Sequence, residues 1–332
     1  MPFLLTGNQF KQRNKMETKK LNKIFNPKVI AIIGASAKEG SVGHALMKNI
    51  IGSGFDGIVY PINPKRSNIL GVKSYQSLEE IPDRVDLAII ATPARTVPEV
   101  VENCGKAGVS GILLISAGFS EIGEEGKKLT DQIKASVRKY GMRMIGPNCL
   151  GFIKPSIWLN ASFATKMALP GKIAFISQSG ALCTAILDWS VEQNVGFSHF
   201  VSIGSMIDVS FHDLIDYFGS DPHTSSILVY MESLSDARSF LSAARAFARN
   251  KPIIVLKVGK SSEGAQAAMS HTGSLAGNDF VFDAAFKRAG VIRVDTIEEL
   301  FNIAQSLAMQ ERPLGNRLAI ITNAGGPGVI AT

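Results

Sequence analysis

The sequence predicts an α/β fold with two doubly wound parallel sheets and the start of a third α/β unit. Short runs rich in Val, Ile, Leu and Ala alternate with helical patterns along the 332 residues. Uninterrupted apolar strands of this kind are typical of parallel sheets that helices cover on both faces. Three apolar strands end in small residues, VIAIIGAS, KIAFISQSGA and LAIITNAGGPG, so three alternating units are expected.

The first unit contains five strand candidates and two clear helical patterns. Apolar periodicity predicts helices at 97–108 and 124–141. The predicted strands are 28–36, 57–64, 86–94, 111–119 and 142–148. We expect residues 1–20 to be a tail and residues 21–155 to form the first domain.

The second unit follows a weakly patterned stretch at 154–171, which reads as a linker. Its predicted strands are 172–177, 198–204, 225–232, 252–259 and 291–296, with helices between them. We expect residues 156–312 to form this domain. Residues 313–332 hold a strand and a turn without a helix to cover them, so the sequence predicts a chain truncated within a third domain.

Composition argues against several classes of protein. No apolar run reaches the roughly 18 residues of a membrane helix, and the amino terminus lacks the features of a signal peptide, although either Met1 or Met16 can be the true start. The cysteines Cys104, Cys149 and Cys183 form no disulfide or metal pattern, which favours a cytoplasmic location. The net charge of +7 is spread along the chain and suits anionic ligands, so neither nucleic acid nor a membrane is expected as a partner.

The first small-residue turn favours a ligand that carries phosphate. A strand followed by small residues and a helix leaves unpaired N–H groups at the positive end of the helix dipole. The glycines Gly34, Gly40 and Gly43 depart from the GxGxxG spacing, so tight strand-to-helix packing stays open as an alternative. Lys65 and Arg66 stand where an NAD site needs an acid, which favours the phosphorylated ribose of NADP or coenzyme A.

The second small-residue turn places Ser179 on a strand-to-helix bend, as in a hydrolase nucleophile elbow. That elbow needs a glycine two residues earlier, where this chain has Ser177. No well-placed Asp and His pair follows it in the sequence. We therefore interpret Ser179 as a phosphate ligand and helix cap, and the neighbouring Gln178 as positional.

One of the five histidines differs from the others. His271 lies in GAQAAMSHTGSLAGNDF, where small residues allow close approach to a ligand. On this argument alone, a surface histidine in a flexible loop stays open as the alternative. Structural or solvated roles are expected for His44, His199, His212 and His223, and because none has metal-ligand spacing, no metal site is expected.

Eight short motifs resemble those of the NDP-forming acyl-CoA synthetases in order and separation. They are IGAS…GSVG, YPINPK, ATPA, SAGF, GPNCLG, SQSGAL, YMES and SHTGSLAG, and the resemblance covers about residues 22–332. This family is typified by ADP-forming acetyl-CoA synthetase and is related to the α subunit of succinyl-CoA synthetase. The resemblance implies a Rossmann-like CoA-binding domain followed by a flavodoxin-like domain that carries a phosphohistidine.

The resemblance implies a reversible reaction in which acyl-CoA, phosphate and ADP give an acid, CoA and ATP through an acyl phosphate and a phosphohistidine. His271 matches the phosphorylated histidine, and a neutral imidazole is a competent nucleophile near neutral pH. Glu232 matches the glutamate that orients it, although from the residues alone Glu232 reads as a surface acid at a strand end. Ser179, Gly180 and Ala181 match the helix amino terminus that cradles the phosphoryl group.

The resemblance also implies a set of residues that bind CoA. By motif they are Gly34, Ser36, Lys38, Ser41, Val42, Asn63, Lys65, Thr92, Pro93, Ser116 and Gly118. Asn148 would polarise the acyl carbonyl or the phosphate. The adjacent Cys149 takes no part in the family's catalysis, so a buried small residue is expected there.

The family's ATP-grasp portion is missing from the 332 residues. An ATP-grasp β subunit or fused region is therefore expected as a partner, and it would supply the sites for ADP or ATP and Mg²⁺. A small acyl substrate and an oligomeric assembly are also expected. Two other functions stay open, a non-catalytic CoA-sensing module and an NADP-dependent oxidoreductase. The sequence does not decide the acyl group, ADP versus GDP, the oligomeric state or whether the truncated chain is active.

Overall fold

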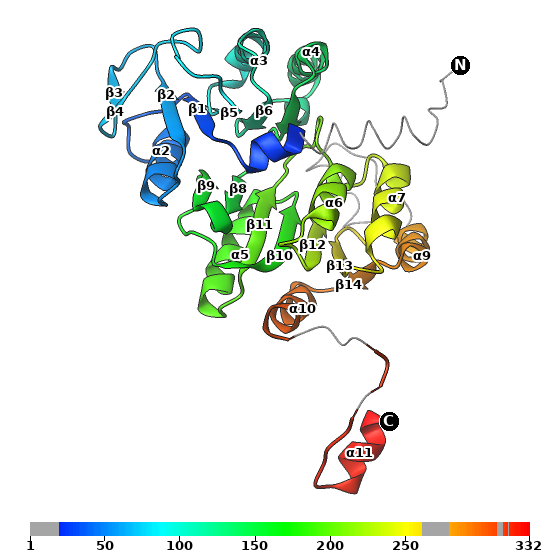
Figure 1. Cartoon of the computed structure of the whole chain (residues 1–332). Helices are drawn as coiled ribbons and strands as arrows, with labels where there is room; N and C mark the ends of the chain where they lie inside the picture. Colours follow the sequence, from blue (N-terminus) through cyan, green and yellow to red (C-terminus); the bar gives the residue numbers. More distant parts are fainter. Residues whose placement is uncertain (1–19, 261–278, 311–314, 318) are drawn as a thin grey trace.

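The computed structural model describes residues 20–260, 279–310, 315–317 and 319–332, and it has an α/β architecture (Figure 1). The first sheet is fully parallel, with strand order β2-β1-β5-β6-β7. Its strands are β1 Val29–Ile33, β2 Ile58–Ile62, β5 Leu87–Ile90, β6 Gly111–Leu114 and β7 Arg143–Ile145. A short hairpin of β3 Asn68–Ile69 and β4 Val72–Lys73 follows β2.

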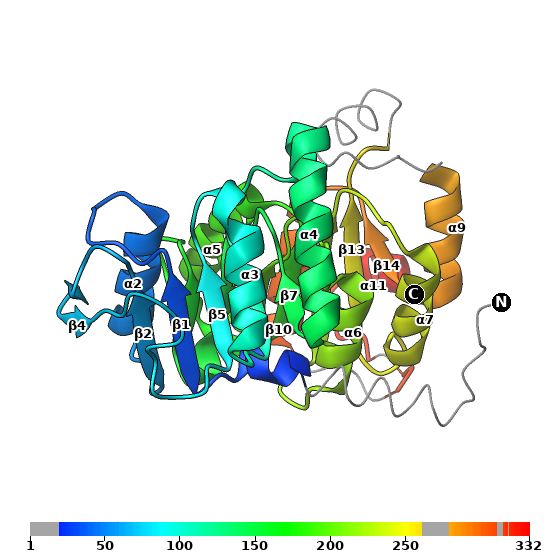
Figure 2. The same cartoon turned by 90° about the horizontal axis from the view of Figure 1, so that it is seen from above.

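Helices cover both faces of this sheet, as its apolar strands require. On one face, α3 Val97–Lys106 and α4 Glu124–Tyr140 lie side by side (Figure 2). On the other face lie α2 Val42–Gly52 and the helical residues 20–25. Successive residues of β1 alternate between the two cores, since Ile30 and Ile32 pack with α2, whereas Ala31 packs with α3 and α4.

The second sheet has strand order β14-β13-β12-β10-β11-β8-β9, and its central strands are parallel. These parallel strands are β10 Pro170–Ser177, β11 Phe197–Ser202, β12 Ser226–Met231, β13 Ile253–Lys257 and β14 Ile292–Val294. The helices of this half are α5 Gly180–Glu192, α6 Phe211–Ser220, α7 Ala237–Phe247, α9 Asp279–Ala289 and α10 Ile297–Met309. The first sheet is parallel, the second is parallel apart from the edge formed by β8 and β9, and helices accompany both, which matches the predicted α/β fold class.

The linker prediction for 154–171 is wrong at its centre. Strands β8 Gly151–Lys154 and β9 Leu159–Ser162 form an antiparallel pair. β8 also pairs with β11, so the two strands extend the edge of the second sheet. Each strand has four residues, which is too short for apolar alternation to be recognised in the sequence. The second sheet therefore begins at Gly151, ahead of the domain boundary expected after residue 155.

The prediction of an uncovered strand near the carboxyl end is also wrong for the described residues. Residues 319–323 form no strand, and a short helix, α11 Gly325–Ala331, follows them. Ile321 is 97% exposed. An isolated strand leaves its backbone N–H and C=O groups without partners, so an apolar pattern alone does not make a strand here.

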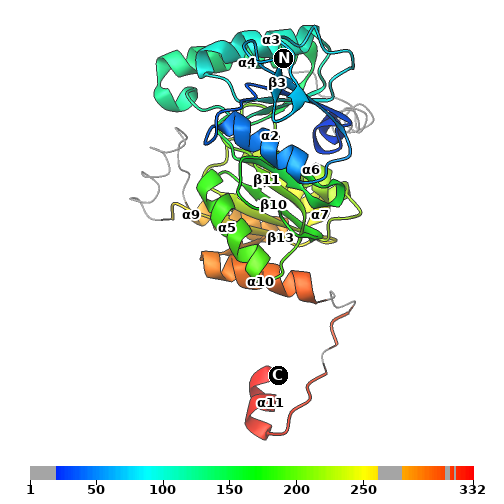
Figure 3. The same cartoon turned by 90° about the vertical axis from the view of Figure 1, so that its left-hand side faces the viewer.

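The two sheets are joined by hydrogen bonds and by one continuous apolar core. Figure 3 shows α2 against the strands of the second sheet, and the core around α2 continues into that sheet. The Asn49 side chain of α2 donates to the backbone oxygens of Ser162 at 2.7 Å and Ala164 at 2.8 Å. From β7, Arg143 forms ion pairs with Asp208 at 3.1 Å and Asp213 at 2.8 Å. These contacts hold the two halves in one arrangement.

His199 is buried on β11 between the two halves. Its ring lies near Phe25, Tyr217 and Phe218, with ring centroids 5.4, 6.0 and 4.7 Å away. Neither ring nitrogen has a hydrogen-bond partner among the described residues. Burial holds the pKa of His199 well below its usual range because it disfavours the charged imidazolium.

We expect His199 to make the protein less stable as the pH falls below neutral. In the unfolded chain this imidazole takes up a proton near pH 6.5, whereas in the folded chain it does so only at lower pH. The free energy of unfolding is therefore unaffected by this group above about pH 6.5. Below that value it falls with the pH, by up to about 1.4 kcal/mol per pH unit. Urea unfolding at pH 7, 6 and 5 should show a shallower loss for His199→Phe than for wild type.

The control is Gln76→Ala, which removes an exposed side chain without a titratable group and should keep the wild-type pH dependence. Equal pH dependence of wild type and His199→Phe would contradict the expectation.

Candidate functional site

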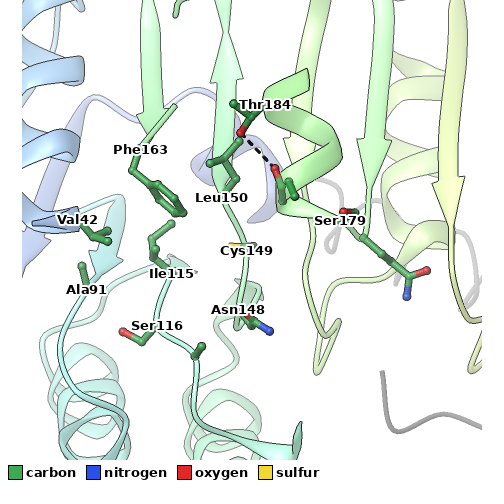
Figure 4. Close-up of a pocket in the computed structure, with 14 residues that line it drawn as sticks. Val42, Ala91, Ile115, Ser116, Asn148, Cys149, Leu150, Phe163, Ser179 and Thr184 are labelled. Atoms are coloured by element: carbon green, nitrogen blue, oxygen red, sulfur yellow. Dashed lines mark hydrogen bonds between the residues drawn. The ribbon is translucent and has the colours of Figure 1, made fainter. Parts of the chain in front are cut away.

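A cavity of about 540 Å³ lies where the carboxyl ends of the first sheet's strands meet the amino terminus of α5 (Figure 4). The first half of the chain lines it with residues that follow β5, β6 and β7 or begin α2, namely Val42, Ala91, Ile115, Ser116, Ala117, Asn148 and Cys149. The second half contributes Leu150, Phe163, Gln178, Ser179, Gly180, Ala181 and Thr184. Ligands of open α/β sheets bind at this edge, beyond the carboxyl ends of the strands.

The cavity brings together six of the residues predicted from the sequence. They are Val42, Ser116, Asn148, Ser179, Gly180 and Ala181. The other described residues of the predicted set do not line it. These are Gly34, Ser36, Lys38, Ser41, Asn63, Lys65, Thr92, Pro93, Gly118 and Glu232. His271 lies outside the described residues.

The glycine spacing of the first turn follows from close backbone contacts. Gly34 has φ +93°, and a Cβ atom there would lie 2.6 Å from the Ala91 carbonyl oxygen. A Cβ atom on Gly43 would overlap the carbonyl oxygen of Gly34. Ser41 caps α2, and its Oγ accepts a hydrogen bond from the backbone N–H of His44 at 3.3 Å. The first turn is therefore built for tight packing of β1 against α2, which carries Val42 to the cavity.

Several predicted CoA-binding residues support this turn through their own hydrogen bonds. The Asn63 side chain donates to the Ala35 oxygen at 2.8 Å and accepts from the Lys65 backbone N–H at 2.9 Å. Ser36 Oγ accepts from the Lys38 backbone N–H at 3.0 Å. The side chains of Lys38 and Lys65 are exposed, which leaves two cations at the surface beside the turn.

The segments after β5, β6 and β7 are tied to one another below the cavity. Ser116 Oγ donates to the Thr92 carbonyl oxygen at 2.6 Å. The Asn148 backbone N–H donates to the Ser116 oxygen at 2.9 Å, and Asn148 has φ +55°. Pro93 precedes the 3₁₀ turn Ala94–Thr96, and the Gly118 N–H donates to Glu121 at 2.7 Å. The Asn148 side chain is left exposed at the cavity.

The opposite wall is the amino terminus of α5. Ser179 is the N-cap, since its Oγ accepts from the Leu182 N–H at 3.3 Å. Ser177 Oγ accepts from the Ser179 N–H at 3.0 Å, which fixes the bend between β10 and α5. The first N–H groups of a helix have no partner within the helix and lie at its positive end. Because Gly180 and Ala181 line the cavity, an anion there can accept hydrogen bonds from them.

Gln178 links this wall to Glu232. Its Oε1 accepts from the backbone N–H of Glu232 at 2.6 Å and of Ser233 at 3.0 Å, and its Nε2 donates to Ser233 Oγ at 3.1 Å. Gln178 therefore positions the end of β12, consistent with the positional role predicted for it. Glu232 itself is only 9% exposed, which differs from the surface acid that its residue type alone suggests.

Cys149 lies in the cavity wall but is poorly suited to thiol chemistry. Its Sγ donates to the Leu114 carbonyl oxygen at 3.3 Å. Burial raises the pKa of the Cys149 thiol to about 12. At pH 8 the thiolate, which is the nucleophilic form, is therefore scarce.

We expect iodoacetamide to leave Cys149 essentially unmodified in the folded protein at pH 8. Cys104 and Cys183 are also buried and free, so all three should react only after urea unfolds the chain. Mass spectrometry of tryptic peptides, with and without urea, tests this. Fast alkylation of Cys149 in the folded protein would contradict the raised pKa and reopen a role for the thiol.

Sequence reasoning missed most of the apolar lining. Ala91 and Leu150 lie in quoted motifs but have no polar group that singles them out, Ile115 reads as an ordinary strand residue, and Phe163 lay in the presumed linker. These residues come close to the predicted site residues only when both sheets have formed. Within the described residues, no group of three or more His, Cys, Asp or Glu side chains is arranged to hold a metal ion. No described helix has the length and apolarity to cross a bilayer.

Comparison with known proteins gives the family of each half. Residues 28–155 match the CoA binding domain family, and residues 170–307 match the succinyl-CoA ligase like flavodoxin domain family. The match to the α subunit of ADP-forming acetate–CoA ligase I from Pyrococcus furiosus is 48% identical and covers 94% of this chain and 68% of that protein. The match to the ADP-forming 4-hydroxybutyrate–CoA ligase of Nitrosopumilus maritimus is 42% identical and covers 93% of this chain and 45% of that protein.

A solved structure agrees with these sequence matches. It is the dinucleotide-forming acetyl-coenzyme A synthetase 1 of Candidatus Korarchaeum cryptofilum, in complex with phosphate and ADP, and it is 40% identical with a TM-score of 0.88. The alignment covers 93% of this chain and 67% of that chain. This chain thus spans about two thirds of the Pyrococcus subunit and less than half of the Nitrosopumilus protein. On this evidence the chain belongs to the family of ADP-forming acetate–CoA ligases.

Proposed function

We propose that this chain is the CoA-binding and phosphoryl-transferring part of an ADP-forming acyl-CoA ligase. The reaction is acyl-CoA plus phosphate plus ADP giving the acid, CoA and ATP. The observation that supports it best is one cavity lined by Ser116 and Asn148 from the first half and by Ser179 to Ala181 from the second. The cavity therefore has polar groups for both an acyl group and a phosphate.

In the first step a phosphate oxygen attacks the thioester carbonyl, the carbon–sulfur bond breaks, and the CoA thiol leaves with a proton. The exposed amide of Asn148 is available to the carbonyl oxygen as negative charge develops on it. The N–H groups at the start of α5 bind the phosphate oxygens without reorganising. The products are free CoA and an acyl phosphate.

In the second step an imidazole nitrogen of His271 attacks phosphorus, and the acid leaves as a carboxylate. Glu232 would hold the other ring nitrogen and stabilise the cationic phosphohistidine. The hydrogen bonds from the Glu232 and Ser233 backbone to Gln178 keep this acid next to the α5 wall. Transfer to ADP completes the reaction.

The last transfer needs a partner. The described residues hold no metal-ligating cluster, and the Pyrococcus relative is named as an α subunit. An ATP-grasp β subunit or fused region would supply the sites for ADP and Mg²⁺, and an oligomeric complex follows from that need. A cytoplasmic location suits the three buried, unpaired cysteines.

Calorimetric titration of the chain with CoA, dephospho-CoA and NADP tests the proposal. We expect CoA to bind about tenfold more tightly than dephospho-CoA, because a charge-assisted hydrogen bond from an exposed Lys65 to the 3′-phosphate is lost. Lys65→Ala should remove this difference, and the equally exposed Lys73→Ala should keep it. Binding of NADP without binding of CoA would overturn the proposal in favour of an oxidoreductase.

A further inference from the structure

Residues 202–205, at the end of β11 and just after it, contact both walls of the cavity without lining it. The buried Ser202 Oγ accepts a hydrogen bond from the backbone N–H of Leu150, a wall residue, at 3.0 Å. The Ile203 N–H donates to the Ser177 carbonyl oxygen at 2.8 Å, at the end of β10 where the α5 wall begins. One short segment is therefore bonded to both sides of the site.

Gly204 packs against the backbone of Asn148. It is buried, and a Cβ atom on it would lie 2.1 Å from the Pro147 carbonyl oxygen and 2.5 Å from that of Asn148. Real Cβ atoms do not come this close to an oxygen atom, so only a glycine fits here without displacing a backbone. The contact fixes how near the two segments come to each other.

The Asn148 backbone is held at its N–H as well as at its carbonyl group. The N–H donates to the Ser116 oxygen at 2.9 Å, and Asn148 has φ +55°. This left-handed conformation is uncommon for a residue with a side chain and persists where the surrounding structure holds it. A shift at Gly204 would therefore redirect the Asn148 side chain, which lies at the cavity.

The segment that follows Gly204 forms a backbone ladder with β7 and with the turn after β7. Its three bonds join the Ser205 N–H to the Pro147 oxygen at 2.9 Å, the Ile207 N–H to the Gly146 oxygen at 3.3 Å, and the Val209 N–H to the Met144 oxygen at 3.1 Å. A side chain on Gly204 would have to break this ladder or displace the Asn148 carbonyl group. Loss of three bonds makes the first response the costlier one, so the displacement falls on Asn148.

We propose that Gly204 is a positioning residue for cleavage of the thioester, because it sets where Asn148 lies relative to the amino terminus of α5. This inference rests on the proposed function, which assigns the acyl carbonyl to Asn148 and the phosphate to α5. Gly204 does not line the cavity, so it acts through Asn148 and not on the substrate. When Asn148 moves and the α5 wall stays in place, the attacking oxygen and the carbonyl carbon lose their alignment.

Arsenolysis of acetyl-CoA follows the thioester step in the 332-residue chain without ADP. Arsenate takes the place of phosphate, so its oxygen attacks the carbonyl carbon, the carbon–sulfur bond breaks, and CoA leaves with a proton. Water then hydrolyses the acyl arsenate to acetate and arsenate. A thiol reagent measures the released CoA, and calorimetric titration measures CoA binding.

We expect Gly204→Ala to lower kcat about 100-fold, since misplacement of a reacting group by about 1 Å can cost that much. The KM for acetyl-CoA and the Kd for CoA should stay close to the wild-type values, because the interaction that is lost belongs to the transition state. A general loosening of the cavity would instead weaken binding.

Gly196→Ala is the matched control. Gly196 is buried at the opposite end of β11 from Gly204. A Cβ atom on Gly196 would lie 2.1 Å from the Pro170 carbonyl oxygen, which is the same close approach to a backbone. Gly196→Ala should therefore cause a similar clash away from the cavity and keep kcat. Thermal melting of each variant reports whether it is folded at the assay temperature.

A double-mutant cycle with Asn148→Gly tests whether Gly204 acts through Asn148. Glycine is chosen because it accepts φ +55°. Asn148→Gly alone should lower kcat about 10²-fold or more. In that background Gly204→Ala should lower kcat by less than about twofold further, since the side chain on which it acts is gone. Equal fold losses in both backgrounds would overturn the inference.

Ser202→Ala tests the same segment without adding atoms, should Gly204→Ala fail to fold. It leaves the Leu150 N–H without its acceptor, two residues after Asn148, and should lower kcat about tenfold. The control is Ser226→Ala, because the buried Ser226 Oγ has no hydrogen-bond partner among the described residues. It should keep kcat.

The outcomes separate this inference from the function on which it rests. Wild type that releases no CoA thiol would overturn the proposed function and the inference together. An active wild type with equal kcat losses in Gly204→Ala and Gly196→Ala, or with full kcat in Ser202→Ala, would overturn the inference alone.

Discussion

Replacement of Arg143 by alanine is expected to lower the free energy of unfolding by about 3–5 kcal/mol. Arg143 is 9% exposed and pairs with Asp208 and Asp213 from the second half of the chain. Asp208 also accepts from the Met144 backbone N–H at 2.7 Å. Burial already raises the pKa of Asp208, so removal of the guanidinium leaves two carboxylates without their cation in a poorly solvated place.

Urea unfolding at pH 7 measures this loss. The control is Arg138→Ala, which removes an exposed arginine from α4 and should change the free energy by less than about 0.5 kcal/mol. Neutralising the acids in the triple variant Arg143→Met, Asp208→Asn, Asp213→Asn should restore part of the stability, because no unpaired charge then stays buried. An effect of Arg143→Ala no larger than that of Arg138→Ala would show that the ion pairs contribute little.

Replacement of His271 by asparagine is expected to abolish acyl-CoA-dependent ATP formation by the chain together with the ATP-grasp partner proposed above, a loss of more than about 10³-fold. The reason is chemical, because an amide nitrogen is not nucleophilic and cannot take the phosphoryl group. The covalent step can be followed separately from turnover. Incubation with acyl-CoA and radiolabelled phosphate should label wild type in an acid-labile, base-stable form, and His271→Asn should stay unlabelled.

His223→Asn is the matched control, since His223 is an exposed histidine outside the cavity. It should keep both turnover and labelling. Full activity of His271→Asn would leave the CoA-sensing module as the better reading of this chain.

The parallel strands could be predicted from the sequence because each is a short apolar run that ends in small residues. The antiparallel pair β8 and β9 could not, since its ladder depends on a partner, β11, that lies some 40 residues later in the chain. The ion pairs of Arg143 were equally hidden, because nothing in the local sequence connects it to Asp208 or Asp213. These features depend on contacts between residues far apart in the sequence, and a local sequence pattern does not reveal such contacts.

The polar part of the site was accessible from the sequence because Ser179, Gly180 and Asn148 have residue types and positions with a chemical meaning. Phe163 and Leu150 have none, since an apolar residue near a cavity looks the same in a sequence as one in a core. Ser36 and Asn63 illustrate the opposite case. Motifs single them out, yet in the structure their side chains make local hydrogen bonds that shape the first turn.

The cavity has walls from both sheets, so it exists only while the two halves are docked. A ligand that fills it binds the docked state alone and shifts the folding equilibrium by mass action, adding about 2.7 kcal/mol at a concentration one hundred times its Kd. CoA would thereby stabilise the contact between the two halves. Chains that lack CoA would be the ones that open first and become accessible to proteases, so the turnover of this protein would follow the supply of its own substrate.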